Sequence, residues 1–101
     1  MFIRNDIQFE WDENKNLLNI SKHGVSFMQA KNIFWDEDAL MILDEEHSLQ
    51  EERFALVGMD RNANMFTVVF TTRNNDSIIR IISARYAAKQ EMIDYFNRRR
   101  K

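Results

Sequence analysis

The stretch MFTVVFTTRNNDSIIRIISAR, residues 65–85, decides the fold class because it holds two apolar runs around a short polar cluster. β-branched and aromatic residues favour strands, and a cluster such as RNND between two such runs is typical of a hairpin turn. We therefore predict strands over 65–72 and 77–83. A third strand is predicted over 54–59, because the turn-like segment DRNAN joins it to the first of these two. Together the three strands form an antiparallel meander.

The segment near the N-terminus has the signals of a first helix. Asp12 can cap a helix that ends near Lys22, and Gly24 can then adopt the left-handed conformation that stops it. Leu17 and Leu18 are expected to face inward from this helix. The preceding IQFEW alternates apolar and polar residues and therefore predicts a short strand.

Three further elements complete the predicted chain. Ser26 and Gln29 form a capping box for a second helix that extends to about Phe34. This helix should bury its apolar residues, which are Phe27, Ala30, Ile33 and Phe34. The apolar run ALMIL, 39–43, predicts another strand, and residues 87–99 predict a closing helix. The apolar stripe of the closing helix holds Met92, Tyr95 and Phe96.

The order of elements indicates an α+β fold in a single domain over residues 1–101. We expect an antiparallel β-sheet with two N-terminal helices and a C-terminal helix on one side of it. The chain has no Pro, two Gly, no internal repeat and no low-complexity segment, so the sequence indicates no linker and no second domain.

Composition excludes several classes of protein. Cys is absent, so a disulfide framework, a thiol nucleophile and a thiolate metal site are excluded. No apolar run is long enough for a membrane span, and the N-terminal residues have no signal-peptide pattern. We therefore expect a cytoplasmic protein with no membrane partner.

Charge is distributed unevenly, although the net charge is only −2. Residues 36–52 hold eight acids and no Lys or Arg, so the rest of the chain holds all fourteen basic residues against the other eight acids, a balance of +6. This polarity allows a basic face opposite an acidic one. The alternative is a well-solvated surface that ends in the charged tail RRRK.

Basic residues recur along the predicted first helix. Lys15 and Lys22 are seven residues apart, which is close to two helical turns, so both project from one side. Lys22 and His23 at the C-terminal end allow two interpretations. They can stabilise the helix end through its dipole, by about 0.3–1 kcal/mol, or they can form half of a site that binds phosphate.

Arg80 lies within SIIRIIS, where a charged side chain needs either a protein partner such as Glu52 or a ligand. Arg85 follows just after this strand, and strand alternation places it on the opposite face from Arg80. Arg53 begins an earlier strand. His47, within the acidic run, is interpreted as a surface residue.

The sequence lacks the signatures of several other chemistries. The histidines and acids lack the spacing of a metal site, Gly-x-Ser-x-Gly is absent, and two glycines cannot build a Gly-rich phosphate loop. Lys, His and Arg remain. They suit RNA because its 2′-hydroxyl can attack the adjacent phosphate while the protein moves protons and stabilises charge on the phosphate oxygens.

Four motifs in order resemble the BrnT toxins, the ribonuclease half of the BrnT–BrnA type II toxin–antitoxin systems. They are F-x-W-D-x-x-K, K-H-G-V-x-F, E-x-R-F and I-S-A-R, and the resemblance extends from Phe9 into the final helix. It implies a RelE-like fold and an endoribonuclease that cleaves RNA without a metal or other cofactor and arrests growth. It also implies a BrnA-like ribbon-helix-helix antitoxin as partner, with promoter DNA bound only by the toxin–antitoxin complex.

The resemblance also implies site residues, carried over where the motifs match. The expected catalytic residues are Lys22, His23, Arg53, Arg80 and Arg85, with His23 as the proton-transfer group and the arginines stabilising phosphate charge. Lys15 and Arg73 are expected to bind RNA, and no residue is expected to bind a metal. The alternative function is a non-catalytic binding module that represses transcription together with a DNA-binding partner.

Overall fold

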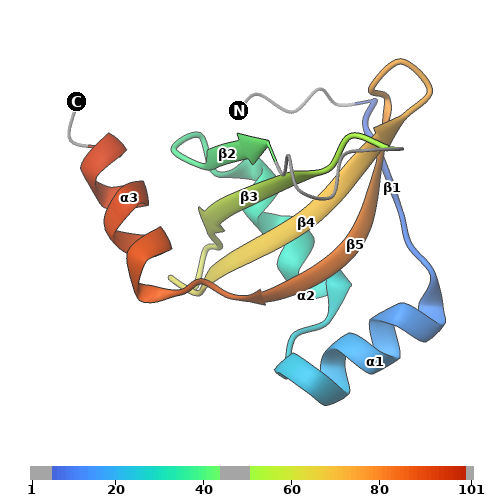
Figure 1. Cartoon of the computed structure of the whole chain (residues 1–101), viewed down its shortest axis with the longest axis horizontal. Coiled ribbons are helices and arrows are strands. Elements are labelled where there is room, and N and C mark those ends of the chain that lie inside the picture. Colours follow the sequence, from blue (N-terminus) through green and yellow to red (C-terminus); the bar gives the residue numbers. More distant parts are fainter. Residues whose placement is uncertain (1–5, 44–50, 100–101) are drawn as a thin grey trace.

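The computed structural model describes residues 6–43 and 51–99, and a five-stranded sheet with helices on both faces forms its centre (Figure 1). His47 and part of the acidic run lie outside the described residues, as does the end of the basic tail. The elements in chain order are β1 Gln8–Glu10, α1 Glu13–His23, α2 Phe27–Ala30, the 3₁₀ helix η1 Lys31–Trp35, β2 Leu40–Leu43, β3 Phe54–Met59, β4 Met65–Arg73, β5 Ile78–Tyr86 and α3 Lys89–Arg99.

The strands lie in the order β1-β5-β4-β3-β2. The predicted meander is confirmed, since β3, β4 and β5 pair antiparallel in sequence, and β2 adds to β3 in the same way. The prediction of a wholly antiparallel sheet is wrong, however, because β1 pairs with β5 in parallel. No hairpin turn joins these two strands, and the long intervening chain allows the parallel direction.

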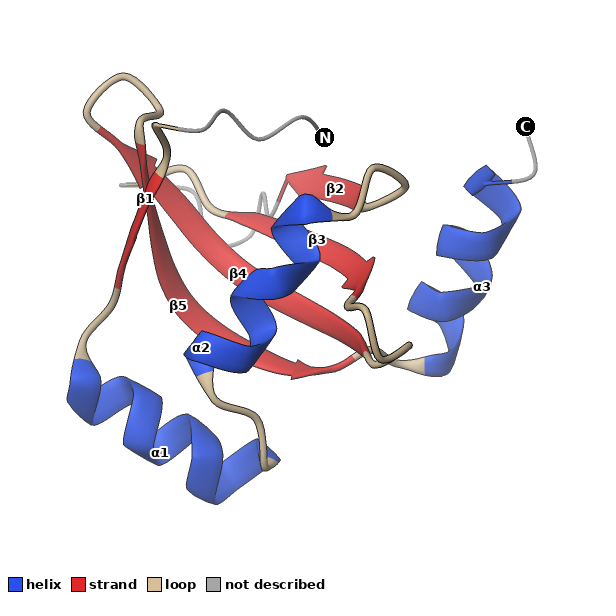
Figure 2. Cartoon of the chain, turned by 180° about the vertical axis from the view of Figure 1, so that it is seen from behind, coloured by secondary structure: helices blue, strands red, loops and turns tan. Residues whose placement is uncertain are grey.

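The two faces of the sheet have separate cores. On one face, Leu56, Val68 and Ile79 pack against the buried residues of α2 and η1, and Figure 2 shows α2 lying across the strands. On the other face, Tyr95 of α3 packs against Val57 and Met65. The prediction that all helices cover one side is therefore wrong: α3 lies on the face opposite α2, because consecutive β3 residues such as Leu56 and Val57 point to opposite faces.

Local signals place the helix ends as predicted. Asp12 accepts hydrogen bonds from the backbone of Asn14 and Lys15, and Gly24 adopts φ 71° at the C-terminal end of α1. Ser26 caps α2 by accepting from the backbone N–H of Gln29. The predicted second helix is divided into α2 and η1, and its four apolar residues are buried as expected. No helix among residues 6–43 and 51–99 is long and apolar enough to span a membrane.

The inward face of α1 is polar, which contradicts the prediction for Leu17 and Leu18. These side chains are 57% and 69% exposed, whereas Asn16 and Asn19 are buried. The Asn19 amide donates to Ala84 O at 2.7 Å and accepts from Ala84 N at 3.1 Å. Because β1 pairs with β5 only as far as Arg80, Asn19 supplies the hydrogen bonds that a longer strand would otherwise make.

A bulge in β5 changes the direction of its last residues. Ile81 pairs with Phe70 and Ser83 pairs with Val69, so Ile82 is the extra residue. Arg80 and Arg85 then oppose Thr71 and Thr67, which lie on one face of β4. The prediction that Arg85 faces away from Arg80 is therefore wrong.

Candidate active site

A polar row crosses the sheet on the face opposite α2. Thr71 of β4 pairs with Arg80 of β5, and Arg80 pairs with Glu10 of β1. Arg53 directly precedes β3, and extending the register of that strand by one pair places Arg53 opposite Thr71. We call Arg53, Thr71, Arg80 and Glu10 the arginine row. It brings together two of the three arginines that were expected to be catalytic, with a carboxylate that the sequence did not indicate.

Arg80 has a protein partner of its own. Its Nη1 donates to Glu10 Oε2 at 2.6 Å, and the two side chains are 30% and 39% exposed. This pair explains how a guanidinium is tolerated within a strand of isoleucines. The partner is Glu10 rather than the suggested Glu52. No local signal could have identified it, because the two residues meet only through the parallel pairing of β1 with β5.

The other members of the row are held by the strands. Thr71 is buried, and its hydroxyl donates to the carbonyl of Glu52 at 2.7 Å, which fixes the chain just before Arg53. The side chain of Arg53 is half-buried, with its Nε atom fully covered. A guanidinium anchored along its stem in this way keeps its direction, which favours the binding of a phosphate in one orientation.

Arg85 is on the same face but is bound to α3. It donates to both carboxylate oxygens of Glu91 at 2.7 and 2.9 Å, and Glu91 also accepts from Thr67 and from the backbone of Ala88. The hydrogen bonds from Arg85 lower the pKa of Glu91, and the same contact raises the pKa of Arg85. Glu91 thus fixes Arg85 and neutralises much of its charge.

The other basic residues expected at the site lie elsewhere. Lys15 and Lys22 are exposed on α1, and His23 is half-buried at its C-terminal end. Within the described part of the chain, neither Lys22 nor His23 forms a side-chain hydrogen bond or an ion pair. The described contacts therefore do not bring this helix end to the arginine row. Arg73, at the end of β4, forms an ion pair with Glu51 at 3.2 Å.

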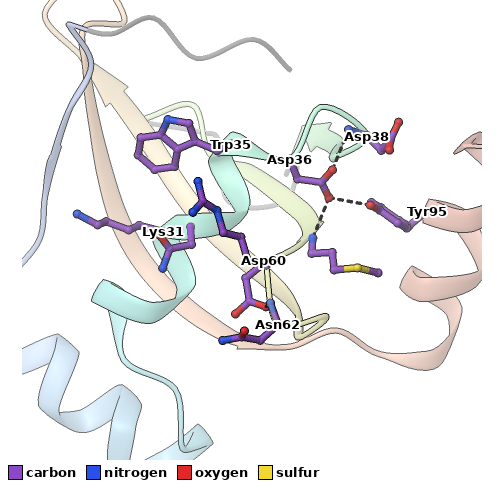
Figure 3. Close-up of a pocket in the computed structure, with 10 residues that line it drawn as sticks. Lys31, Trp35, Asp36, Asp38, Asp60, Asn62 and Tyr95 are labelled. Carbon is purple, nitrogen blue, oxygen red and sulfur yellow. Dashed lines mark hydrogen bonds between the residues drawn. The ribbon is translucent and has the colours of Figure 1, made fainter.

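A pocket of about 830 Å³ lies between η1, the turn after β3 and α3 (Figure 3). Its charged lining comprises Lys31, Arg61, Asp36, Asp38 and Asp60. Asp36 accepts from Tyr95 Oη at 2.7 Å and from Met59 N at 2.9 Å, so it anchors α3 to the sheet. Because the carboxylates outnumber the cations, this pocket suits phosphate less well than the arginine row does.

Comparison with known proteins identifies the family. The sequence profile of the family described as "Ribonuclease toxin, BrnT, of type II toxin-antitoxin system" matches residues 11–91, which is most of the chain. The chain belongs to the BrnT family. The match covers all the residues expected at the site, from Lys15 to Arg85.

A solved structure supports the fold of this BrnT family member. The Brucella abortus ribonuclease toxin BrnT is similar with a TM-score of 0.61 and 22% identity, and the likeness covers 82% of this chain and 99% of that one. At this identity the likeness shows the fold alone. No curated protein sequence matches the chain significantly.

Proposed function

We propose that this chain is a metal-independent endoribonuclease with a RelE-like fold, which arrests growth in the cytoplasm until a BrnA-like antitoxin neutralises it. The observation that carries the proposal is the arginine row, in which Arg53 and Arg80 are both partly exposed and lie on one face of the sheet. RNA supplies its own nucleophile, the 2′-hydroxyl. The protein therefore needs to hold the phosphate, to transfer protons and to stabilise negative charge in the transition state.

The arginines have different proposed roles. Arg80 and Arg53 bind the scissile phosphate, because a guanidinium can donate two parallel hydrogen bonds to phosphate oxygens. Arg85 contributes charge from its fixed position beside Glu91, and Arg73 contacts the RNA strand at the far end of β4. Lys15, Lys22 and His23 are proposed to contact the same strand where it passes the edge of the sheet, because Asn19 joins their helix to β5.

Cleavage of a defined RNA in EDTA tests this proposal. The purified protein should cleave the RNA and leave a 2′,3′-cyclic phosphate and a 5′-hydroxyl end. Arg80→Ala should lower the rate by about 100-fold or more, the size typical of losing a positioned donor to the transition state. Arg61→Ala is the matched control, because Arg61 lines the pocket between η1 and α3 and is not part of the arginine row.

Circular dichroism and thermal unfolding of both variants separate loss of chemistry from loss of fold. A folded Arg80→Ala variant that cleaves at the rate of the unchanged protein would refute the assignment of Arg80. A pure, folded and unchanged protein that cleaves no RNA, with or without ribosomes, would refute the ribonuclease proposal.

Exposed apolar side chains favour a second candidate function, that of a non-catalytic module that represses transcription with a DNA-binding partner. Ile93 and Phe96 on α3 are 41% and 40% exposed, and the residues of β2 from Met41 to Leu43 are similarly exposed. Such side chains suit a protein interface. This candidate predicts a stable complex with a ribbon-helix-helix protein that binds promoter DNA, and no cleavage by the free chain.

A further inference from the structure

We propose that Glu10 is the general base of this site, accepting the proton of the attacking 2′-hydroxyl; the assignment rests on the ribonuclease function proposed above. Glu10 is the carboxylate of the arginine row and contacts Arg80 directly, with Oε2 at 2.6 Å from Nη1. A phosphate that binds Arg80 would therefore be placed beside a proton acceptor.

The geometry of β1 supports this role. Glu10 is the last residue of β1 and lies opposite Arg80 in the parallel register, on the sheet face that carries Arg53 and Thr71. The neighbouring Phe9 points to the opposite face and packs against the core there, so β1 is fixed from behind. A base held by a strand and an ion pair has a defined direction, which general-base catalysis requires.

The charged groups of the arginine row are also compatible with a carboxylate that acts as general base. The described groups that face Glu10 are Arg80 of β5 and, farther along the row, Arg53. Guanidinium groups stay protonated at all accessible pH values. Gln8, which shares the face of β1 with Glu10, carries no charge. The Glu10 carboxylate is therefore the proton acceptor that the described side chains of this row offer.

The exposure of Glu10 matches the need for access. Its side chain is 39% exposed, so a ribose can reach the carboxylate without displacing a helix. His23, the proton-transfer group expected from the sequence, ends α1 and makes no described contact with the row. Glu91 is a poorer candidate, because its two oxygens already accept from Arg85, Thr67 and the backbone of Ala88.

The proposed step is a transesterification within the RNA. The 2′-hydroxyl gives its proton to the Glu10 carboxylate, and its oxygen forms a new bond to phosphorus. The bond from phosphorus to the 5′-oxygen breaks, and that oxygen takes a proton from water. The products are a 2′,3′-cyclic phosphate and a 5′-hydroxyl, and Glu10 returns its proton to solvent. Arg80 and Arg53 hold the phosphate oxygens throughout.

The test compares Glu10→Gln with the unchanged protein on one defined RNA in EDTA. Gln keeps the size of Glu and an oxygen that can accept from Arg80, so the fold should be retained. We expect the single-turnover cleavage rate to fall about 100-fold or more, as is usual for loss of a general base. Binding of an uncleavable oligonucleotide with a 2′-deoxy group at the scissile position should not weaken, because Arg80 keeps its charge and loses only an anionic neighbour.

The pH profile separates a base from a structural ion pair. The cleavage rate of the unchanged protein should fall on acidification, and Glu10→Gln should lack this acidic limb of the profile. Glu51→Gln is the matched control, since Glu51 also forms an ion pair with a strand arginine; it should keep the limb. If Glu10→Gln does not fold, Glu10→Asp replaces it, and a reduced rate with the acidic limb retained is expected.

Two outcomes would overturn the assignment: Glu10→Gln that cleaves at the unchanged rate with the acidic limb intact, or Glu10→Asp that folds and shows no loss of rate. Both require a parent protein that cleaves RNA. If the parent protein cleaves no RNA, the proposed ribonuclease function fails. If the parent cleaves RNA and the Glu10 variants cleave it equally well, only the assignment of Glu10 fails. The two failures are therefore distinguishable.

Discussion

Asn19 offers the sharpest test of how α1 is attached to the sheet. Its side chain is 6% exposed and takes part in three hydrogen bonds with the backbone: to Val25 O at 2.8 Å, to Ala84 O at 2.7 Å and from Ala84 N at 3.1 Å. Each such bond contributes about 0.5–1.5 kcal/mol net. Asn19→Ala should therefore lower the free energy of unfolding by about 3 kcal/mol, a large fraction of the roughly 5–15 kcal/mol typical of a domain.

Urea denaturation followed by circular dichroism measures this change. Asn14→Ala is the control, because Asn14 is exposed on the same helix and only its backbone N–H takes part in the Asp12 cap. The control should change the free energy of unfolding by less than about 0.5 kcal/mol. If Asn19→Ala were no more destabilising than Asn14→Ala, the edge of β5 would not depend on this amide, and our account of the polar inner face of α1 would be wrong.

Two further predictions concern stability. Glu91→Gln should destabilise the fold by about 1–2 kcal/mol at neutral pH, an ordinary value for a partly exposed charge-assisted contact. The hydrogen bonds from Arg85 lower the folded-state pKa of Glu91, so this stabilisation is present above the ordinary value of 4.5 and is lost as the pH falls through the lower folded value. The denaturation curves of both proteins should therefore converge on acidification, and a constant difference would contradict the reasoning. Gly58→Ala should lower the free energy of unfolding by about 1–3 kcal/mol through overpacking. The added Cβ would lie 2.9 Å from Ile33 Cβ and 3.3 Å from Ile33 O. An unchanged denaturation midpoint would show that η1 can move aside.

Local chemistry explains what the sequence could predict. The strands of the meander follow from apolar runs broken by turn clusters, and the caps at Asp12, Gly24 and Ser26 follow from residues whose side chain or backbone suits one position. These signals span a few residues, so they survive in any tertiary context. The same local signals single out Arg53 and Arg80 as charges beside or within apolar strands, whereas their roles at the site come from the family resemblance and stay a prediction.

Long-range features could not be predicted in this way. The parallel pairing of β1 places Glu10 beside Arg80, although 70 residues separate them in the sequence. The bulge at Ile82 reverses the alternation that was used to orient Arg85. In α1 Leu17 and Leu18 are exposed whereas Asn19 is buried, because the uncovered edge of β5 needs hydrogen bonds more than apolar contact. Each of these features depends on which segments pair in the folded protein, and local sequence signals do not specify that pairing.

The net charge of −2 is compatible with a site for RNA because the described charges are separated across the fold. Asp36, Asp38 and Asp60 lie around the pocket between η1 and α3, where Asp36 anchors Tyr95 and Asp60 accepts hydrogen bonds within its own turn. These carboxylates have structural roles away from the arginine row. Over a distance longer than the Debye length of about 8 Å, salt screens their repulsion of a bound strand. We therefore expect local guanidinium groups, rather than the total charge, to determine where a phosphate binds, with Glu10 as the carboxylate of the described row that we propose as proton acceptor.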